Sequence, residues 1–519
     1  MISFPTDQTR LLATSLIVCS ILSAEDAPLV LNVRTRVQAA DGSREYHAIL
    51  KKQNLNSATT AVVVCDMWDA HWCKGATRRV AEMAPRVNQV LHEARKRGML
   101  IIHAPSNTLG YYKDTPQRKL AQAAPKVQAK VPLKNWCHLD KGRESSLPID
   151  DRDGGCDCDP KCRSRRAWTK QIESIDIKAG DAITDNAEAY YLMKQRGIEN
   201  VIVLGVHTNM CVLGRPFSVR QMAYQGMNVL LMRDLTDTMY NSRRSPFVSH
   251  FTGTDLVVEH IEKFWCPTIT SADLLGGESF RFKNDKRKHI VFVIAEMEYK
   301  TKDTLPPFAT KHLGRDFRVS FVHASPKDRN DLPGLEVLDE ADLALFSIRR
   351  RTPPKEQMAA IRRFVESGKP LVAIRTTSHA FALRSGKPRE GHTDWPEFDA
   401  QILGGNYAGH HGNKGSNGPK TFVWATDAAA KHPIMKGMPT GEFVVRSWLY
   451  KAAPLLKTAT TLMVGRVENL KPHQPVAWTN TPAKGGKVFY TSLGHVDDFR
   501  LPAFQTMLRN SIYWAAGLP

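Results

Sequence analysis

Two short segments of the chain combine residue types that could carry out nucleophilic chemistry. The first is Gly205-Val206-His207-Thr208-Asn209-Met210-Cys211-Val212, in which Cys211 follows a β-branched apolar run and precedes a helix-like stretch. A cysteine at the start of a helix lies beside backbone N–H groups without partners, and these favour a thiolate. The alternative is an ordinary buried cysteine, which is common. The motif makes Cys211 a candidate nucleophile.

The second segment, Ala61-Val62-Val63-Val64-Cys65-Asp66-Met67-Trp68-Asp69, supplies a carboxylate. In a parallel sheet, such an apolar run is buried on both faces, and its carboxyl end faces the ligand crevice. If the two runs form neighbouring strands, Asp66 and Cys211 are placed as a base and a nucleophile. Together the segments predict a catalytic site at one edge of a sheet.

Over roughly residues 57–270, these segments and the following strand Asn228 to Met232 resemble the isochorismatase-like cysteine hydrolases. The resemblance implies that Asp66 takes the thiol proton and that Cys211 attacks a carbonyl or related carbon. It also implies a cis peptide bond between Val206 and His207, which helps to aim backbone N–H groups as an oxyanion hole. The expected activity is hydrolysis of a small amide or a related C–N or ether bond.

The chain departs from that family at the third catalytic residue, a lysine. The matching stretch, Asp181-Ala182-Ile183-Thr184-Asp185-Asn186, contains no lysine, and Lys134 and Lys170 are substitutes from elsewhere. Loss of the cation would weaken thiolate formation and stabilisation of the developing anion. A second interpretation therefore stays open, in which the protein is catalytically weakened and binds carbohydrate or another small molecule.

Other polar residues near the first segment are weaker candidates. Asp69, His71 and His103 could bind a metal ion, but polar residues at the mouth of a pocket explain them better. Trp68 and Trp72 either stack on a planar or sugar-like substrate or simply pack. We expect neither a metal nor a cofactor in this site.

The elements that must position these residues alternate between strands and helices. Strands are expected at 61–65, 99–104, 181–184, 201–204 and 228–232, with helices at 77–97, at 188–196 and from Cys211 to about Gly226. Such alternation predicts a parallel sheet covered by helices on both faces. The first domain is expected over residues 57–275, after a signal peptide and an extended lead-in that contains a strand-like run from Leu29 to Val37.

A polar, basic stretch at 276–288 is the expected linker, and a second α/β pattern occupies residues 289–519. This half resembles the ThuA-like family, named for trehalose utilisation, whose fold is that of class I glutamine amidotransferases. The resemblance implies a second three-layer α/β/α domain with a mainly parallel sheet and a link to carbohydrate metabolism. The motifs that carry it are Val372 to His379, His432 to Pro439, Pro475 to Trp478 and Gly486 to His495.

The second domain has its own candidate site. Where an amidotransferase places its cysteine at a sharp turn, this chain has Arg375-Thr376-Thr377, so glutaminase chemistry is not expected. His379 and His495, both near strand ends, are the better candidates for ligand binding. His410 and His411 follow in a glycine-rich loop that is expected to lie close to them.

Three of the nine cysteines cluster in a loop that is rich in Gly, Asp and Pro. Cys156, Cys158 and Cys162 lie within an insertion near residues 130–166 that is expected to cover the site. Their spacing fits no common structural zinc pattern well, so metal binding is the less favoured interpretation. In an exported protein, one or more disulfides are expected instead.

Length, charge and the N-terminus complete the picture. A chain of 519 residues is too long for one core, and its net charge of +20 is accompanied by no nucleic-acid-binding motif. Residues 1–24 resemble a signal peptide, with an apolar run from Leu11 to Leu22 and cleavage after Ala24, so export is expected. No other segment is expected to span a membrane. We expect small-molecule and carbohydrate ligands and no nucleic acid, and leave a homo-oligomer open.

Overall fold

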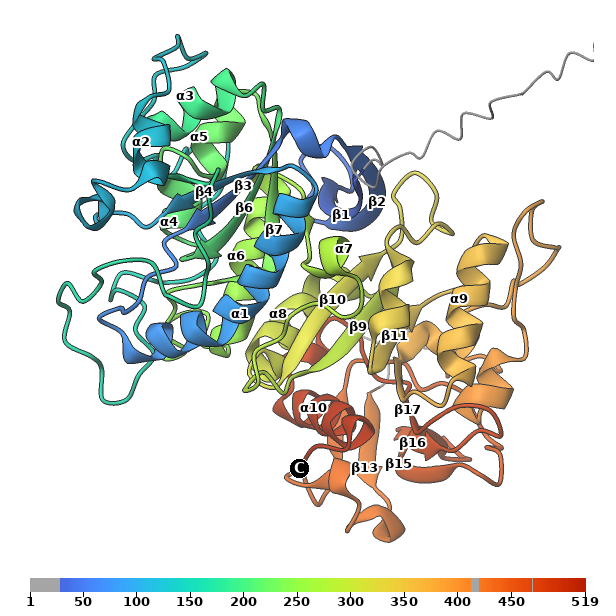
Figure 1. Ribbon diagram of the computed structural model, residues 1–519. Helices are drawn as coiled ribbons and strands as arrows, with labels where there is room; N and C mark the ends of the chain where they lie inside the picture. Colours follow the sequence, from blue (N-terminus) through green and yellow to red (C-terminus); the bar gives the residue numbers. More distant parts are fainter. Residues whose placement is uncertain (1–28, 412–419, 469) are drawn as a thin grey trace, which may run out of the picture.

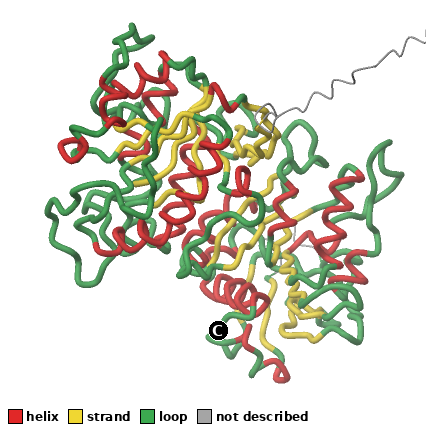
Figure 2. Tube along the Cα trace, viewed as in Figure 1, coloured by secondary structure: helices red, strands yellow, loops and turns green. Residues whose placement is uncertain are grey.

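The computed structural model describes residues 29–411, 420–468 and 470–519, which form two α/β domains, each built on one sheet (Figures 1 and 2). The predicted signal peptide lies outside the described residues. Both domains place helices on the two faces of their sheet, which confirms the predicted three-layer arrangement. None of the described helices is both long and apolar enough to cross a membrane.

The first sheet has the strand order β2-β1-β8-β7-β6-β3-β4-β5. Strands β3 to β8 are parallel wherever they pair, and β3 is buried at every position because helices cover both faces. The strands are β1 (Leu29–Gln38), β2 (Tyr46–Leu55), β3 (Thr60–Cys65), β4 (Leu100–Ala104), β5 (Ala182–Ile183), β6 (Asn200–Val206), β7 (Asn228–Asp237) and β8 (Thr268–Ile269).

Seven helices belong to this domain in the described chain. Helices α1 and α7 cover one face of the sheet, and α3, α5 and α6 cover the other. The helices are α1 (Lys74–Lys96), α2 (Pro116–Gln122), α3 (Glu188–Gln195), α4 (Cys211–Gly214), α5 (Val219–Tyr224), α6 (His250–Phe264) and α7 (Ala272–Leu275).

The single helix expected from Cys211 to Gly226 is wrong, because α4 ends at Gly214 and α5 begins only at Val219. Pro216 explains the interruption. A proline disfavours helical geometry in the preceding residue and lacks an N–H of its own. Arg215 accordingly has an extended conformation, with φ −68° and ψ 155°.

The second sheet has the order β10-β9-β11-β12-β17-β16-β15-β13-β14. Its first five strands are parallel, whereas the strands from β16 to β14 continue the sheet in an antiparallel manner, so this sheet is more mixed than expected. The strands are β9 (Lys288–Ala295), β10 (Phe317–His323), β11 (Leu343–Ile348), β12 (Leu371–Ile374), β13 (Thr421–Ala425), β14 (Phe443–Val445), β15 (Thr460–Val467), β16 (Gln474–Asn480) and β17 (Val488–Thr491).

The three α-helices described in this domain divide between the two faces of the sheet. Helices α8 (Thr301–Leu313) and α10 (Pro502–Ala516) pack on one face, and α9 (Lys355–Glu366) packs on the other. Helix α9 ends two residues before Gly368, whose φ of +83° suits the turn that follows a helix.

The lead-in and the linker are both part of the folded structure. Strands β1 and β2 form an antiparallel hairpin that joins the first sheet through the pairing of Arg34 with Thr268, so this sheet begins before residue 57. In the linker, the Phe280 amide donates to Asp234 (2.8 Å), and Arg287 forms an ion pair with Asp255 (2.8 Å). The stretch between the domains is therefore docked rather than extended.

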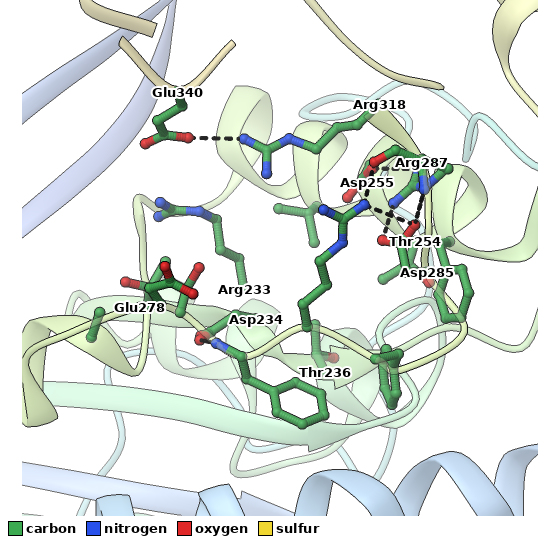
Figure 3. A pocket seen from close by; sticks show the side chains of 18 of the residues that line it. Arg233, Asp234, Thr236, Thr254, Asp255, Glu278, Asp285, Arg287, Arg318 and Glu340 are labelled. Carbon is green, nitrogen blue, oxygen red and sulfur yellow. Dashed lines mark hydrogen bonds and ion pairs between the residues drawn. The ribbon is translucent and has the colours of Figure 1, made fainter. Parts of the chain in front are cut away.

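A cavity of about 670 Å³ lies where the hairpin, the linker and the second domain meet (Figure 3). Much of the charge around it is paired locally, as in the ion pair between Arg318 and Glu340 (3.0 Å). Neither Asp66 nor Cys211 lines this cavity, so it is separate from the predicted catalytic site. Its charged lining comprises Arg34, Arg233, Asp234, Asp255, Glu278, Arg281, Asp285, Arg287, Arg318 and Glu340.

Candidate active site

The structure brings Asp66 and Cys211 together at one edge of the first sheet. Strands β3 and β6 are parallel neighbours paired up to Cys65 and Gly205, so the residues that follow them meet beyond their carboxyl ends. The Asp66 carboxylate interacts directly with the Cys211 thiol. Asp66 is fully buried, whereas Cys211 keeps 8% of its surface exposed. A solute can thus reach the sulfur more easily than the carboxylate.

Asp66 is held firmly through one of its two carboxylate oxygens. Oδ1 accepts a hydrogen bond from the Ser106 amide (2.7 Å), and the Asp66 amide donates to Ala104 O (3.1 Å). Its φ of +49° lies in the left-handed region, which aspartate tolerates better than most residues. Oδ2 has no conventional hydrogen bond from the described residues. It is therefore free to take a proton from the thiol.

The cation beside this pair is Arg215, a residue that the sequence analysis did not identify. Its Nε lies 3.6 Å from Asp66 Oδ2, and its guanidinium also interacts with the Cys211 thiol. The two lysines expected to replace the catalytic lysine interact with other residues. Lys170 forms an ion pair with Glu173, and the charge of Lys134 acts to lower the pKa of Cys137. Two features of the sequence could have identified Arg215. It lies four residues after Cys211, and Pro216 directly after it breaks the helix.

Burial dominates the electrostatics of the pair. It raises the pKa of the Cys211 thiol well above its ordinary value, and the Asp66 charge raises it further. Burial also raises the pKa of Asp66, while Arg215 acts to lower the pKa of both groups. Burial and the Asp66 charge therefore oppose the thiolate that the start of the helix is expected to favour.

Backbone groups complete this edge of the sheet. The peptide bond between Val206 and His207 is cis, and the Thr208 amide donates to Asp237 O (2.9 Å). The Cys211 amide begins α4 and donates to no acceptor among the described residues. Because the first amides of a helix lack intrahelical partners, this N–H is available to a negatively charged oxygen near the sulfur.

Aromatic rings form a cluster next to the pair, which we call the aromatic cluster: Trp68, His71, Trp168 and His207. Trp68 stacks on Trp168 at 4.8 Å, and the His71 ring lies 4.9 Å from that of His207. Burial and Arg79 lower the pKa of His71 to about 4, and burial and His71 lower that of His207 to about 3. The cluster is therefore uncharged at neutral pH.

The other candidates in this region have structural partners. Asp69 accepts from the Thr169 amide (2.9 Å). His103 is fully buried, and its two ring nitrogens bond to Gln171 (3.0 Å) and Asp181 (3.1 Å). These contacts leave the imidazole of His103 no nitrogen for a metal ion.

In the second domain, Arg375 occupies the turn after β12. Its φ is +50°, and its guanidinium donates to Ser492 O (2.6 Å) and Trp448 O (2.9 Å). It also lies 4.1 Å from the ring of Tyr450 and bonds to Tyr299 Oη (3.1 Å). A buried cation, bonded through both of its terminal nitrogens, therefore occupies this turn.

The predicted histidines of this domain lie on two sides of Arg375. The His379 ring is 4.4 Å from that of Tyr407, whereas His495 is 5.8 Å from Tyr299. His410 lies with the first of these, since its Nδ1 bonds to Tyr407 Oη (2.8 Å). Burial and Arg350 lower the pKa of His379 to about 2. The edge thus gathers imidazole and phenol side chains around Arg375.

The described chain is a two-domain α/β protein whose first domain holds a buried cysteine and aspartate in contact with a partly exposed arginine. Residues 309–515 match the family model ThuA, described as trehalose utilisation. This match covers most of the second domain and agrees with the resemblance predicted there. No protein of curated function matches the chain.

Solved structures of both predicted families are similar to parts of the chain. A ThuA-like protein from Bacteroides uniformis has 18% identity and a TM-score of 0.34, over 46% of this chain and 95% of its own. A cysteine hydrolase from Pseudomonas syringae pv. phaseolicola has 17% identity and a TM-score of 0.27, over 43% and 92%. An isochorismatase-family protein from Burkholderia thailandensis has 14% identity and a TM-score of 0.24, over 42% and 94%.

Proposed function

We propose that the first domain is a cysteine hydrolase that acts on a small amide or a related C–N or ether bond. The observation that carries this proposal is the interaction of the buried Cys211 thiol with the Asp66 carboxylate, whose Oδ2 has no conventional hydrogen bond from the described residues. A protonated thiol beside such a carboxylate is suited to nucleophilic attack coupled to proton transfer. Arg215 supplies the positive charge that the family places on a lysine.

For an amide substrate, the proton of Cys211 moves to Asp66 Oδ2 as the sulfur bonds to the carbonyl carbon. The carbonyl oxygen becomes negatively charged and accepts a hydrogen bond from the Cys211 N–H. The C–N bond then breaks, the amine leaves with the proton from Asp66, and an acyl thioester remains. Water attacks the thioester, with Asp66 as base, and the S–C bond breaks. The acid is released and the thiol regains its proton.

The test is a screen of small amides with the purified full chain and a Cys211→Ala variant. Hydrolysis should disappear in the variant while cooperative unfolding is retained. Cys266→Ala is the matched control, because Cys266 is also buried in this domain but is not in contact with Asp66. Intact-mass spectrometry should detect an acyl adduct on the wild-type chain. Hydrolysis by Cys211→Ala at the wild-type rate would refute the proposal.

The alternative function is a weakened hydrolase that only binds its small ligand. Absence of the lysine and the raised pKa of Cys211 favour it. Product release and an acyl adduct on Cys211 separate the two, because a bound ligand and an acyl group both block alkylation by iodoacetamide, but only a hydrolase forms the adduct. Binding that protects Cys211 with no product and no adduct would favour the binding protein.

For the second domain, we propose a carbohydrate ligand at the edge that carries His379 and His495. Support comes from the description of the matched family and from the part-exposed ring of Tyr407 beside His379, whose face could stack on a sugar. Isothermal titration of the full chain with disaccharides tests the proposal. Tyr407→Ala should weaken binding, and unchanged affinity in that variant would contradict it.

We also propose that the chain is exported. The support is the apolar run from Leu11 to Leu22, followed by Ser23 and Ala24. Expression of the full gene followed by N-terminal sequencing of the secreted or periplasmic fraction tests this. A mature chain that begins at Glu25 is the expected result, and an uncleaved intracellular chain would contradict it.

A further inference from the structure

Four cysteines from two distant parts of the first domain converge at the start of helix α1. Cys73 immediately precedes this helix, and the other three come from the insertion that follows β4. The sulfur atoms of Cys73, Cys156 and Cys158 all lie within 4.8 Å of one another. The Cys162 thiol interacts with those of both Cys156 and Cys158. We call this group the cysteine cluster.

The separation of the sulfur atoms distinguishes between a disulfide and a metal site. Sγ of Cys73 and Sγ of Cys158 lie 3.8 Å apart, and the eight described cysteines form no disulfide. A disulfide requires about 2.05 Å between its sulfur atoms. Two sulfurs bound at about 2.3 Å to one tetrahedral ion lie about 3.8 Å apart. The observed distance fits a shared ion and is too long for a disulfide, and the disulfides expected from the sequence are absent among these residues.

Backbone amides at the start of α1 point to the cluster. The Lys74 amide donates to Cys162 Sγ (3.5 Å), and the Gly75 amide donates to Cys158 Sγ (3.2 Å). These N–H groups have no partner within the helix and carry its positive dipole end, so they stabilise thiolates rather than neutral thiols. These two amides thus favour the charged form of Cys158 and Cys162 that a metal ion requires.

We propose that Cys73, Cys156, Cys158 and Cys162 bind one Zn²⁺ ion in a tetrahedral, four-thiolate site. Four cysteine ligands complete the coordination of zinc and leave no position for water, which is the pattern of a structural site rather than a catalytic one. The soft thiolate set selects zinc over magnesium or calcium. This site is distinct from the pair of Asp66 and Cys211 and does not depend on the function proposed for that pair.

The position of the cluster indicates what the ion does. Asp157, between two of the ligands, contacts His250 Nδ1 (3.3 Å) and Arg79 Nη1 (3.5 Å). His250 and Arg79 each also contact the Asp237 carboxylate at 2.8 Å. The backbone oxygen of Asp237 accepts a hydrogen bond from the amide of Thr208, which lies in the segment that carries Cys211. The ion would therefore hold the insertion against α1. Through Asp157 and Asp237, it would also stabilise the backbone of the candidate active site.

Metal analysis of the purified full chain tests the proposal. Inductively coupled plasma mass spectrometry should find about one zinc per chain, and Cys73→Ser and Cys158→Ser should each lose it. Cys137→Ser and Cys266→Ser are matched controls, since both residues are buried thiols of this domain outside the cluster. Cobalt reconstitution should give the visible absorption of a tetrahedral thiolate complex in the wild type and the controls only.

A measurement on the unaltered protein guards against variants that fail to fold. Titration of the wild type with an organomercurial should release zinc in step with modification of four thiols, followed with a chromogenic zinc indicator. Three results would overturn the proposal: no bound metal in the folded chain, a disulfide between two of the four cysteines by peptide mapping, or equal zinc loss in the control variants. Bound iron in place of zinc would refute the assigned metal.

Discussion

At the residue scale, Cys211 is governed by two opposing effects. The start of a short helix stabilises a negative charge by about 0.3–1 kcal/mol, whereas burial and the adjacent Asp66 oppose ionisation. Burial is the largest contribution, so the pKa of the thiol is raised. The site therefore needs a base in contact with the sulfur, and the structure provides one in Asp66.

Asp66→Asn should separate the role of Asp66 as a base from its role as an acceptor of the Ser106 amide. It removes the base but keeps an oxygen that can accept the Ser106 amide, so we expect kcat to fall by about 10²–10⁴-fold with little change in stability. Because the Asp66 charge raises the pKa of Cys211, the variant thiol should titrate at lower pH. The pH dependence of alkylation measures that shift. An upward shift, or full activity, would show that Asp66 is not the base.

Arg215 should act in the opposite sense on the same thiol. Its charge lowers the pKa of Cys211 and of Asp66, so Arg215→Gln should move alkylation to higher pH. Loss of a preorganised charge at a reacting centre costs about 10²-fold in kcat, and Arg215→Lys should recover part of it. Steady-state kinetics of the three proteins check this. Equal rates in all of them would exclude a catalytic contribution from this cation.

At the scale of elements, the site depends on how closely β3 and β6 approach each other. Gly205 has a φ of +105°, and a Cβ there would lie 2.1 Å from Cys65 O. No side chain fits between the two strand ends, and this contact holds Asp66 beside the Cys211 segment. The interruption between α4 and α5 has a similar role, because it turns Arg215 out of helical geometry and toward Asp66.

Gly205→Ala should therefore destabilise the first domain by more than about 2 kcal/mol. Gly180→Ala is the matched control, since Gly180 also has a positive φ (+87°) but has nothing within 4 Å of the added Cβ. That change should cost only about 1–2 kcal/mol from the backbone conformation alone. Urea unfolding followed by circular dichroism compares the two. Equal losses of stability would mean that the backbone conformation, and not the close contact of Gly205 with Cys65, determines the cost.

At the scale of the whole molecule, the hydrophobic cores do not cross the domain boundary. The two cores of the first sheet contain only residues up to Phe282, and the two cores of the second contain only residues from Ile290 onward. Polar contacts join the domains, such as the bond of Lys302 to Glu45 (2.6 Å), beside the packing of β2 against β10 and of Val248 against Gly314. Such an interface holds the domains together without contributing to either core.

Residues 286–519 should consequently fold without the first domain. The fragment keeps both of its cores complete and loses polar contacts to the first domain, among them the ion pairs of Arg287 with Asp255 and Asp285 and that of Lys302 with Glu45. We expect cooperative thermal unfolding, measured by differential scanning calorimetry, and a far-ultraviolet spectrum of mixed α/β type. A fragment that is soluble only when joined to the first domain would show that the polar interface is essential for folding.

The sequence alone determined the two α/β domains, the order of their main strands, and the meeting of Asp66 with Cys211. These features follow from local patterns, because a buried parallel strand is recognisable by its apolar run and the carboxyl ends of neighbouring strands share one edge. The ThuA-like half was recognised in the same way, from motifs that each lie within one short stretch of the chain.

Tertiary structure alone decided which distant groups meet. Cys73 joins Cys158 across 85 positions, and the hairpin of β1 and β2 joins the first sheet by pairing with β8, which lies far along the chain. Spacing within one loop could not show a fourth cysteine, and a search for lysine could not find Arg215. Local patterns specify what each segment forms, whereas the burial that raises the pKa of Cys211 and the convergence of the cysteine cluster exist only after the segments have packed.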